Sequence, residues 1–251
     1  MSTASASTEM AIRFRSSIVP ENLGLAPGAA VVRKVKKRNY MCAVDGDGSD
    51  HKSLGPAPFR SLLERDLRTL LGANPTIVDY AIEPHELKYF IANKRGGYDP
   101  HVYVPDVVCR CRQGRIVVID AKISFIASRP EWKNREPFIR EAYWLDHGVR
   151  FTTIQELDIR AQPRLANCQI LERHRYIVPD YAALLRIRDV LAEIGLPATI
   201  EAAVRSARLN SRDGECRAFT AIMNLALAGE LILDLATPFS CLTMIYQATI
   251  R

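Results

Sequence analysis

The sequence predicts an α/β domain followed by a smaller, winged-helix-like helical module. Apolar residues recur at helical spacing over 59–71, and short strands are expected at 76–82, 87–91, 115–123 and 149–154. After Pro179 the pattern changes to three helices and two short strands. We therefore expect a basic, partly disordered arm over 1–55, an α/β domain over 56–178 and the helical module over 179–251.

Proline and glycine residues mark the expected limits of the first helices. The helix at 59–71 follows Pro58 and should end at Gly72. An extended stretch over 98–110 is joined to the strand at 115–123 by a short loop. A second helix, 137–147, should end before Gly148, with Ile139, Tyr143 and Trp144 among its inward-facing residues.

The C-terminal module is predicted from three periodic segments, 181–194, 199–208 and 215–228. Short apolar segments follow at 231–235 and up to residue 246, and suggest a two-stranded β element. Basic and acidic residues nearly balance in this module, which favours a protein partner over DNA.

Composition excludes some classes of protein. The net charge of +6 and pI near 9.1 suit a polyanionic partner without demanding one. No stretch reaches the roughly 20 apolar residues of a membrane span, and residues 1–8 lack the pattern of a secretory signal. The six cysteines include no C-x-x-C pair, so we expect reduced thiols in a cytoplasmic protein, with Cys109 and Cys111 as small buried side chains rather than zinc ligands.

A cluster of basic residues lies within the N-terminal arm. It comprises Arg33, Lys34, Lys36, Lys37 and Arg38. A solvated arm and an arm that contacts DNA phosphates are both consistent with this pattern. The second interpretation is favoured if the rest of the chain binds DNA.

The loop 112–114 indicates a candidate active site. A three-residue loop with glycine at its left-handed position is a common hairpin connection, and it pairs Cys111 with Arg115. The same register places Asp106 opposite Asp120, and Lys122 on the same sheet face. Two opposed carboxylates repel each other unless a cation lies between them, so the pattern predicts a Mg²⁺ site.

Such a site suits phosphodiester hydrolysis. Divalent ions polarise the phosphate, acidify the attacking water and stabilise the leaving oxygen. Lys122 would orient the water or offset developing charge. A further carboxylate from the helix at 59–71 would complete the site, and periodicity does not decide between Glu64 and Asp66. The alternative is a surface hairpin on which Asp120 and Lys122 form a solvated ion pair.

The order and spacing of several motifs from about residue 55 to the end resemble the TnsA-like endonuclease subunit of heteromeric transposases. The matching segments are Ser61-Leu62-Leu63-Glu64-Arg65-Asp66, Asn74-Pro75 through Tyr80 to Glu83-Pro84, Tyr103-Val104-Pro105-Asp106, Ile119-Asp120-Ala121-Lys122, Arg140-Glu141-Ala142-Tyr143-Trp144 and Ala226-Leu227-Ala228-Gly229-Glu230-Leu231.

The resemblance implies a restriction-endonuclease-like PD-(D/E)xK core followed by a winged-helix-like domain. It assigns catalysis to Glu64, Asp106, Asp120 and Lys122, and binding of two Mg²⁺ or Mn²⁺ ions to Glu64, Asp106, Asp120 and Ala121. It also implies cleavage of the 5′ strand at transposon ends, a separate DDE transposase subunit for the 3′ strand, and an AAA+ ATPase regulator bound by the C-terminal domain. This chain departs from the family pattern at Glu83 and at Asp120.

Two alternative functions remain open, a stand-alone restriction- or resolvase-type nuclease and a non-catalytic DNA- or protein-binding scaffold. For Glu83, a structural role beside Pro84 is favoured over a role as an added metal ligand. Core packing is favoured over base stacking for Tyr143 and Trp144, and His85, His101 and His147 are not expected to act as general bases. Further candidate phosphate contacts are Arg129, Lys133, Arg135 and Arg140.

Overall fold

The computed structural model describes residues 19–33, 46, 48, 50–211 and 216–248. The chain is a mixed α/β protein that divides into two compact units. The first runs to Arg65 and resumes over Ile77–Asp158, and the second comprises Asp66–Thr76 and the chain from Ile159 onward. The expected boundary at residue 178 lies between helices α6 (Arg164–Arg175) and α7 (Tyr181–Ile194), which both belong to the second unit.

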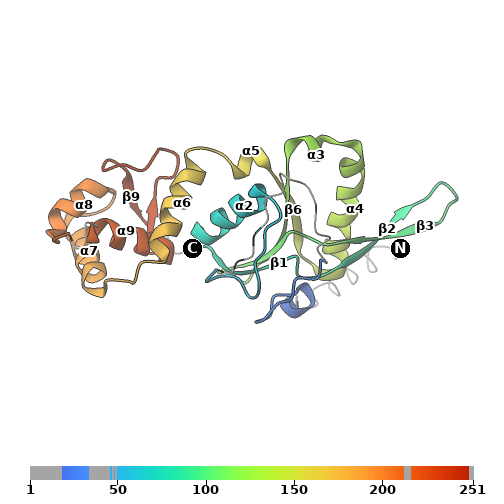
Figure 1. Ribbon diagram of the computed structural model, residues 1–251, viewed down its shortest axis with the longest axis horizontal. Helices are drawn as coiled ribbons and strands as arrows, with labels where there is room; N and C mark the ends of the chain where they lie inside the picture. Colours follow the sequence, from blue (N-terminus) through green and yellow to red (C-terminus); the bar gives the residue numbers. More distant parts are fainter. Residues whose placement is uncertain (1–18, 34–45, 47, 49, 212–215, 249–251) are drawn as a thin grey trace, which may run out of the picture. The chain divides into compact units, whose positions relative to one another are not determined.

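The first unit is built on a four-stranded mixed sheet (Figure 1). Its strand order is β1 (Ile77–Ile82), β4 (Val107–Cys111), β5 (Ile116–Lys122) and β6 (Arg150–Gln155). The first two pairings are antiparallel, and β5 pairs with β6 in parallel. Because a parallel pair needs a crossover, the chain passes through α3 (Ser124–Ser128) and α4 (Pro130–His147) between these strands.

The β4–β5 hairpin has the predicted register. The Cys111 amide donates to the Arg115 carbonyl at 2.8 Å, and Val107 pairs with Ile119. Gly114 has a φ of 73°, the left-handed conformation that this loop requires and that glycine adopts without steric cost. A local turn therefore sets which side chains of the two strands face each other.

The stretch 98–110, expected as one extended segment, is two strands in different sheets. Strand β3 (Tyr98–Tyr103) pairs with β2 (Leu87–Ala92) as a separate two-stranded ribbon, and β4 joins the main sheet. Pro105 lies between them and has no N–H to continue a ladder, which accounts for the break.

Helix α4 begins at Pro130, earlier than residue 137, and ends at Gly148, whose φ is 64°. Ile139 and Tyr143 are fully buried, as expected, whereas the inward placement of Trp144 is wrong because its side chain is 65% exposed. Adjacent residues of a helix point about 100° apart, so Tyr143 and Trp144 do not share one face. The inward tryptophan is Trp132, which is 8% exposed.

Helix α2 (Leu62–Ala73) begins with reciprocal capping and continues through Gly72. The Ser61 hydroxyl accepts from the Glu64 amide at 3.2 Å, and Glu64 Oε2 accepts from the Arg60 amide at 2.6 Å. Gly72 is not the stop that its position suggested. A Cβ at this residue would lie 2.9 Å from the Glu172 carboxyl group, so the glycine permits the close approach of α6.

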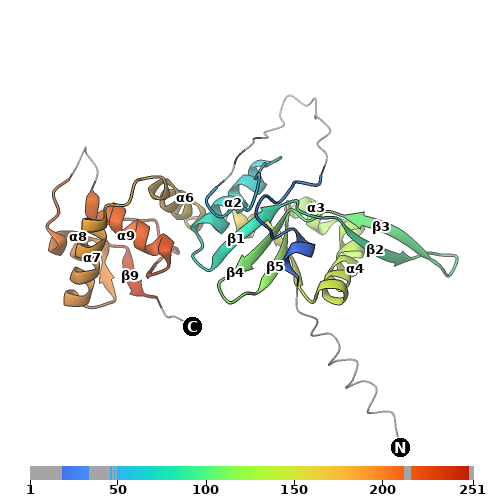
Figure 2. The same cartoon turned by 90° about the horizontal axis from the view of Figure 1, so that it is seen from below.

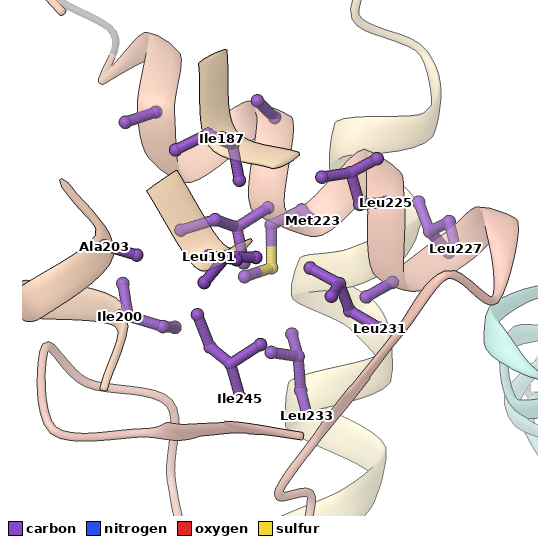
Figure 3. Close-up of a cluster of buried hydrophobic side chains, with 14 of the residues drawn as sticks. Ile187, Leu191, Ile200, Ala203, Met223, Leu225, Leu227, Leu231, Leu233 and Ile245 are labelled. Carbon is purple, nitrogen blue, oxygen red and sulfur yellow. The ribbon is translucent and has the colours of Figure 1, made fainter. Parts of the chain in front are cut away.

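The second unit is a helical domain with a small sheet. Besides α6 and α7 it contains α8 (Ile200–Ala207), α9 (Arg217–Ala228) and a sheet ordered β7 (Ala198–Thr199), β9 (Met244–Gln247) and β8 (Leu231–Leu233). The short helix α5 (Glu156–Ile159) lies at the division between the units. Figure 3 shows Ile187, Met223 and Ile245 meeting in the apolar core of the second unit, where each is fully buried.

The first unit also includes a short 3-10 helix, η1 (Pro20–Leu23), whose Leu23 is fully buried. Leu23 and Leu25 join the core formed by α4 and the sheet, including Val108, Ile139 and Phe151. Figure 2 shows this N-terminal segment in blue. Leu23 and Leu25 are therefore part of the domain that holds the candidate site.

Asn167 of α6 holds the loop between β8 and β9. Its side chain is 1% exposed, donates to the carbonyls of Leu235 (3.2 Å) and Thr237 (2.7 Å), and accepts from the Phe239 amide at 3.0 Å. We expect Asn167→Ala to lower the free energy of unfolding by roughly 2–4 kcal/mol, because three backbone groups lose their partner. Urea denaturation measures this change.

Asn74→Ala is the matched control. Asn74 is exposed, and its side-chain oxygen accepts from the Thr76 amide at 2.9 Å and hydroxyl at 2.8 Å, so its loss should cost less than about 1 kcal/mol. Equal losses for the two variants would contradict a bracing role for Asn167.

Candidate active site

Two buried aspartates face each other where β4 begins and β5 ends. Asp106 is 8% exposed and Asp120 is 1% exposed. The ladder ends with the pair Val107 and Ile119, and Asp106 and Asp120 occupy the next position of the register that the sequence predicted. Asp106 Oδ2 accepts a hydrogen bond from the Ala121 amide at 2.8 Å, which ties the first carboxylate to the neighbouring strand. The carboxylates are therefore fixed by the sheet itself.

Lys122 is held beside this pair by two contacts. Its ammonium forms an ion pair with Asp120 and lies 4.7 Å from the centroid of the Trp132 ring. An ammonium over the face of a tryptophan is attracted by the ring's negative face. The side chain keeps 20% of its surface exposed, and the two contacts fix the position of its charge.

The positive charge near Asp106 and Asp120 does not offset the burial and proximity of the two carboxyl groups. Burial and the charge of Asp120 raise the pKa of Asp106 well above its usual value, against the opposing effects of Lys122 and the Ala121 amide. Burial and the same two carboxylates raise the pKa of the Tyr103 hydroxyl. Asp120 Oδ2 is paired with the Lys122 ammonium, whereas the buried Oδ1 accepts no hydrogen bond within the described residues. Such an oxygen is costly to bury unless a cation or a water binds it.

These residues fit a divalent cation bound partly by water. Among the described residues, no three His, Cys, Asp or Glu side chains gather closely enough to form a complete ligand set. Mg²⁺ does not require one, since it commonly uses one or two carboxylates and retains several waters. Asp106 and Asp120 are the groups that could hold it, and the observation that favours it is the buried Oδ1 of Asp120, which accepts no hydrogen bond from the described residues.

Glu64 and Asp66, which the sequence left as alternatives, have different surroundings. Glu64 is half-buried in the first turn of α2, and its charge is among the causes that raise the pKa of Asp106. Asp66 is buried in the second unit and forms an ion pair with Arg160 at 2.9 Å. Glu64 is therefore near the aspartate pair and Asp66 already has a cationic partner, although Glu64 also caps the helix through the Arg60 amide.

Glu83 joins two arginines to the edge of the site. It is 4% exposed and pairs with Arg33 at 2.9 Å and Arg60 at 2.6 Å. Its amide donates to the Asp106 carbonyl at 3.0 Å, and its φ of 43° is unusual for a residue with a side chain. Both carboxylate oxygens of Glu83 are paired with arginines, and this favours a structural role for the residue over a role as an added metal ligand.

Arg33 is electrostatically linked to the same group. Partial burial lowers its pKa, but the hydrogen bond to Glu83 and the charges of Glu83, Asp106 and Glu64 outweigh this and raise it. Its side chain remains 49% exposed. The other members of the predicted basic cluster, Lys34, Lys36, Lys37 and Arg38, lie outside the described residues.

The basic residues around α4 are partly engaged within the protein. Arg135 donates to the Tyr89 hydroxyl at 2.7 Å, and Arg140 pairs with Glu136 at 2.6 Å. Arg129 lies over the Phe125 ring at 4.5 Å, and Lys133 is exposed. Arg129 and Lys133 are thus the better placed of the four for a phosphate.

Three residues of the site were not expected from the sequence. Tyr103, Trp132 and Arg60 contact or electrostatically affect the predicted residues, but each comes from a different segment. Tyr103 precedes Asp106 closely in sequence, and this proximity was an available signal. Trp132 and Arg60 carry no pattern that distinguishes them from ordinary core and surface positions.

The cysteines are free thiols where the structure describes them. Cys109 is 1% exposed, and burial raises its pKa to about 12, so it is an unreactive core residue as expected. Cys111 is partly buried. Neither contributes to the site.

No protein-family model matches this chain, and no curated protein matches it. In the parts of the chain with described structure, no helix combines the length and apolar character that crossing a membrane requires. A functional interpretation therefore depends on the geometry described above and on the order of the sequence motifs.

We expect millimolar Mg²⁺ to raise the melting temperature of the protein by about 2–4 °C, because a cation bound between Asp106 and Asp120 would stabilise the folded state alone. Differential scanning fluorimetry with and without Mg²⁺ measures the shift. Asp120→Asn should abolish it, whereas Asp66→Asn, which removes a buried carboxylate of the second unit, should leave it intact. The same shift in both variants would exclude the aspartate pair as the binding site.

Acid should destabilise the protein through His85. This ring contacts the Leu23 carbonyl at 3.1 Å and the Tyr143 hydroxyl at 2.9 Å, and burial lowers its pKa from 6.5 to about 4. Between these values the unfolded chain binds a proton that the folded chain does not, so stability falls as the pH drops from 6.5 to 4. The loss is complete below the folded-state pKa.

Asparagine at this position can still donate to the Leu23 carbonyl but does not titrate. We therefore expect the melting temperature of His85→Asn to fall less between neutral and acid pH than that of the wild type. Thermal melts at pH 7.5 and pH 4.5 make the comparison. Identical losses would assign the acid sensitivity to other groups.

Proposed function

We propose that this chain is a metal-dependent DNA endonuclease, and that it serves as the subunit of a heteromeric transposase that cuts the 5′ strand at transposon ends. One observation carries the chemical part of the proposal. Asp106 and Asp120 are close together and buried beside Lys122, and Oδ1 of Asp120 accepts no hydrogen bond within the described residues. The transposition setting is supported by the order of the motifs that resemble the TnsA-like subunits.

Each residue has a distinct role in this proposal. Asp106 and Asp120 would hold Mg²⁺ or Mn²⁺ with Glu64 and the main chain of Ala121, and two ions are proposed. A divalent ion bound there supplies Lewis acidity toward the phosphate and a lowered pKa of water. Lys122, positioned by Trp132, would hold the attacking water or a phosphate oxygen. Hydrolysis would leave a 3′ hydroxyl and a 5′ phosphate.

The surrounding fold is consistent with this assignment. The hairpin that carries Asp106 and Asp120 lies at the centre of the mixed sheet, as a restriction-endonuclease-like PD-(D/E)xK core requires. In the second unit the order α7, β7, α8, α9, β8, β9 and the sheet β7-β9-β8 support a winged-helix-like domain. We propose that this domain binds an AAA+ ATPase regulator, that a DDE transposase subunit cuts the 3′ strand, and that the protein acts in the cytoplasm.

A stand-alone restriction- or resolvase-type nuclease would use the same site. It differs in needing no partner, so it should cut plasmid DNA as an isolated chain. A transposase subunit should cut only when the DDE subunit and the ATPase are present. Genes for both proteins beside this one would favour the second case. A non-catalytic scaffold has no need for a buried Asp120 oxygen that accepts no hydrogen bond from the described residues, which makes it the weakest of the three.

We expect Asp106→Ala and Lys122→Ala each to lower Mg²⁺-dependent cleavage by about 100-fold or more, because each removes charge from the reacting phosphate's surroundings. The assay follows 5′-strand nicking of a plasmid that carries the element's ends, with the isolated chain and with its neighbouring gene products. Asp66→Asn is the control and should cut at the wild-type rate. Unchanged nicking by the Lys122 variant would remove this lysine from the mechanism.

A further inference from the structure

The β2–β3 ribbon projects from the first unit beyond α4, as Figures 1 and 2 both show. Its two strands leave the domain beside the candidate site. Strand β2 begins just after Glu83 and β3 ends just before Asp106, and the Glu83 amide donates to the Asp106 carbonyl at 3.0 Å. The ribbon is therefore anchored at the backbone that positions the catalytic aspartate.

The two faces of the ribbon differ. On the inner face, Leu87 and Tyr89 are each 2% exposed, and the Tyr89 hydroxyl accepts from Arg135 of α4. The outer face carries Phe90 (58% exposed), Tyr98 (71%) and Val102 (52%). The register aligns the outer residues as three cross-strand pairs, Lys88 with Val102, Phe90 with Pro100 and Ala92 with Tyr98, and all six are exposed. No carboxylate lies among them.

The tip adds positive charge on a preformed turn. Asn93 Oδ1 accepts from the amides of Arg95 (3.0 Å) and Gly97 (2.9 Å), so the turn is held by its own hydrogen bonds. Lys94 and Arg95 are exposed, and neither side chain takes part in any of the ion pairs formed among the described residues. Asp99, an acid of β3, accepts a hydrogen bond from Asn93 at 2.9 Å.

We propose that the outer face and tip of this ribbon bind a groove of the duplex that flanks the cleaved bond, a role that rests on the proposed nuclease function. A two-stranded ribbon fits the major groove, where apolar side chains contact thymine methyl groups. Six-residue strands span roughly 20 Å, so the tip cations reach phosphates about six base pairs from the ribbon's base.

The charge pattern favours DNA over a protein partner. Lysine is depleted in the cores of protein–protein interfaces, whereas this surface places Lys88, Lys94 and Arg95 around an apolar centre with no acid on its outer face. The cations complement the charge of a polyanion, and the apolar side chains of the outer face would contact base edges and sugars.

The test measures binding of a fluorescent 30-base-pair duplex by the full-length protein at several salt concentrations without divalent metal. We expect the double variant Lys94→Ala/Arg95→Ala to bind roughly tenfold more weakly, with a slope of log K against log salt reduced by about 1.8, since each phosphate contact contributes about 0.9. Phe90→Ala/Tyr98→Ala should weaken binding with an unchanged slope. Circular dichroism melts verify folding.

Arg112→Ala/Arg115→Ala is the matched control, because it removes the same charge from the tip of the β4–β5 hairpin, at the far end of the strands from Asp106 and Asp120. It should bind DNA as the wild type does. Equal affinities and slopes for the two tip variants would overturn the proposal. So would a change of oligomeric state in Phe90→Ala/Tyr98→Ala with unaltered DNA binding, which would assign the face to a protein interface.

Failure of the nuclease proposal can be distinguished from failure of this one. If Asp106→Ala leaves cleavage unchanged while the ribbon variants lose DNA binding, the ribbon binds DNA and the site assignment is wrong. If Asp106→Ala abolishes cleavage while the ribbon variants bind normally, the site is correct and the ribbon proposal is overturned.

Discussion

The mutual repulsion of two buried carboxylates is the constraint on which the first unit depends. Asp106 directly precedes β4 and Asp120 lies near the end of β5, one position beyond the last ladder pair of Val107 with Ile119, so the hairpin register holds the two carboxylates close together. The protein offsets part of this repulsion with the Ala121 amide and with Lys122. Oδ1 of Asp120 still accepts no hydrogen bond from the described residues. This arrangement supports the cation site proposed above.

The neighbouring elements hold this arrangement rigid. Trp132 of α4 confines the Lys122 ammonium, and Glu83 connects Arg33 and Arg60 to the backbone beside Asp106. Arg60 in turn donates its amide to Glu64 at the start of α2. The chain of contacts links the N-terminal segment, the helix and the sheet around one small region, which is how a preorganised site is built.

Helix α2 illustrates how one element serves two purposes. Its first turn carries Glu64 beside the aspartate pair, while Asp66 and the residues after it belong to the second unit. The second unit has an apolar core of its own around Ile187 and Met223. Neighbouring carboxylates of one helix thus have unrelated partners, and helical periodicity alone does not separate them.

The register of the β4–β5 hairpin could be determined from the sequence alone because it is a local property. A three-residue loop ending in Gly114 fixes which residues pair, and the pairing brings Asp106 and Asp120 together. The helices of the C-terminal module and most strands were also recoverable, since their periodicity and stops are local. The order of motifs supplied the preference for Glu64.

Tertiary structure decided whatever depends on contacts between distant segments. Helix α2 continues through Gly72, where Glu172 leaves no room for a Cβ. Trp132 rather than Trp144 is buried, because α4 starts earlier than expected and buries the face that carries Trp132. Glu83 is neutralised by arginines that lie 50 and 23 residues away in sequence. Where a helix ends, and which residue pairs with a buried charge, depends on packing between segments that are distant in sequence. A local sequence pattern does not contain this information.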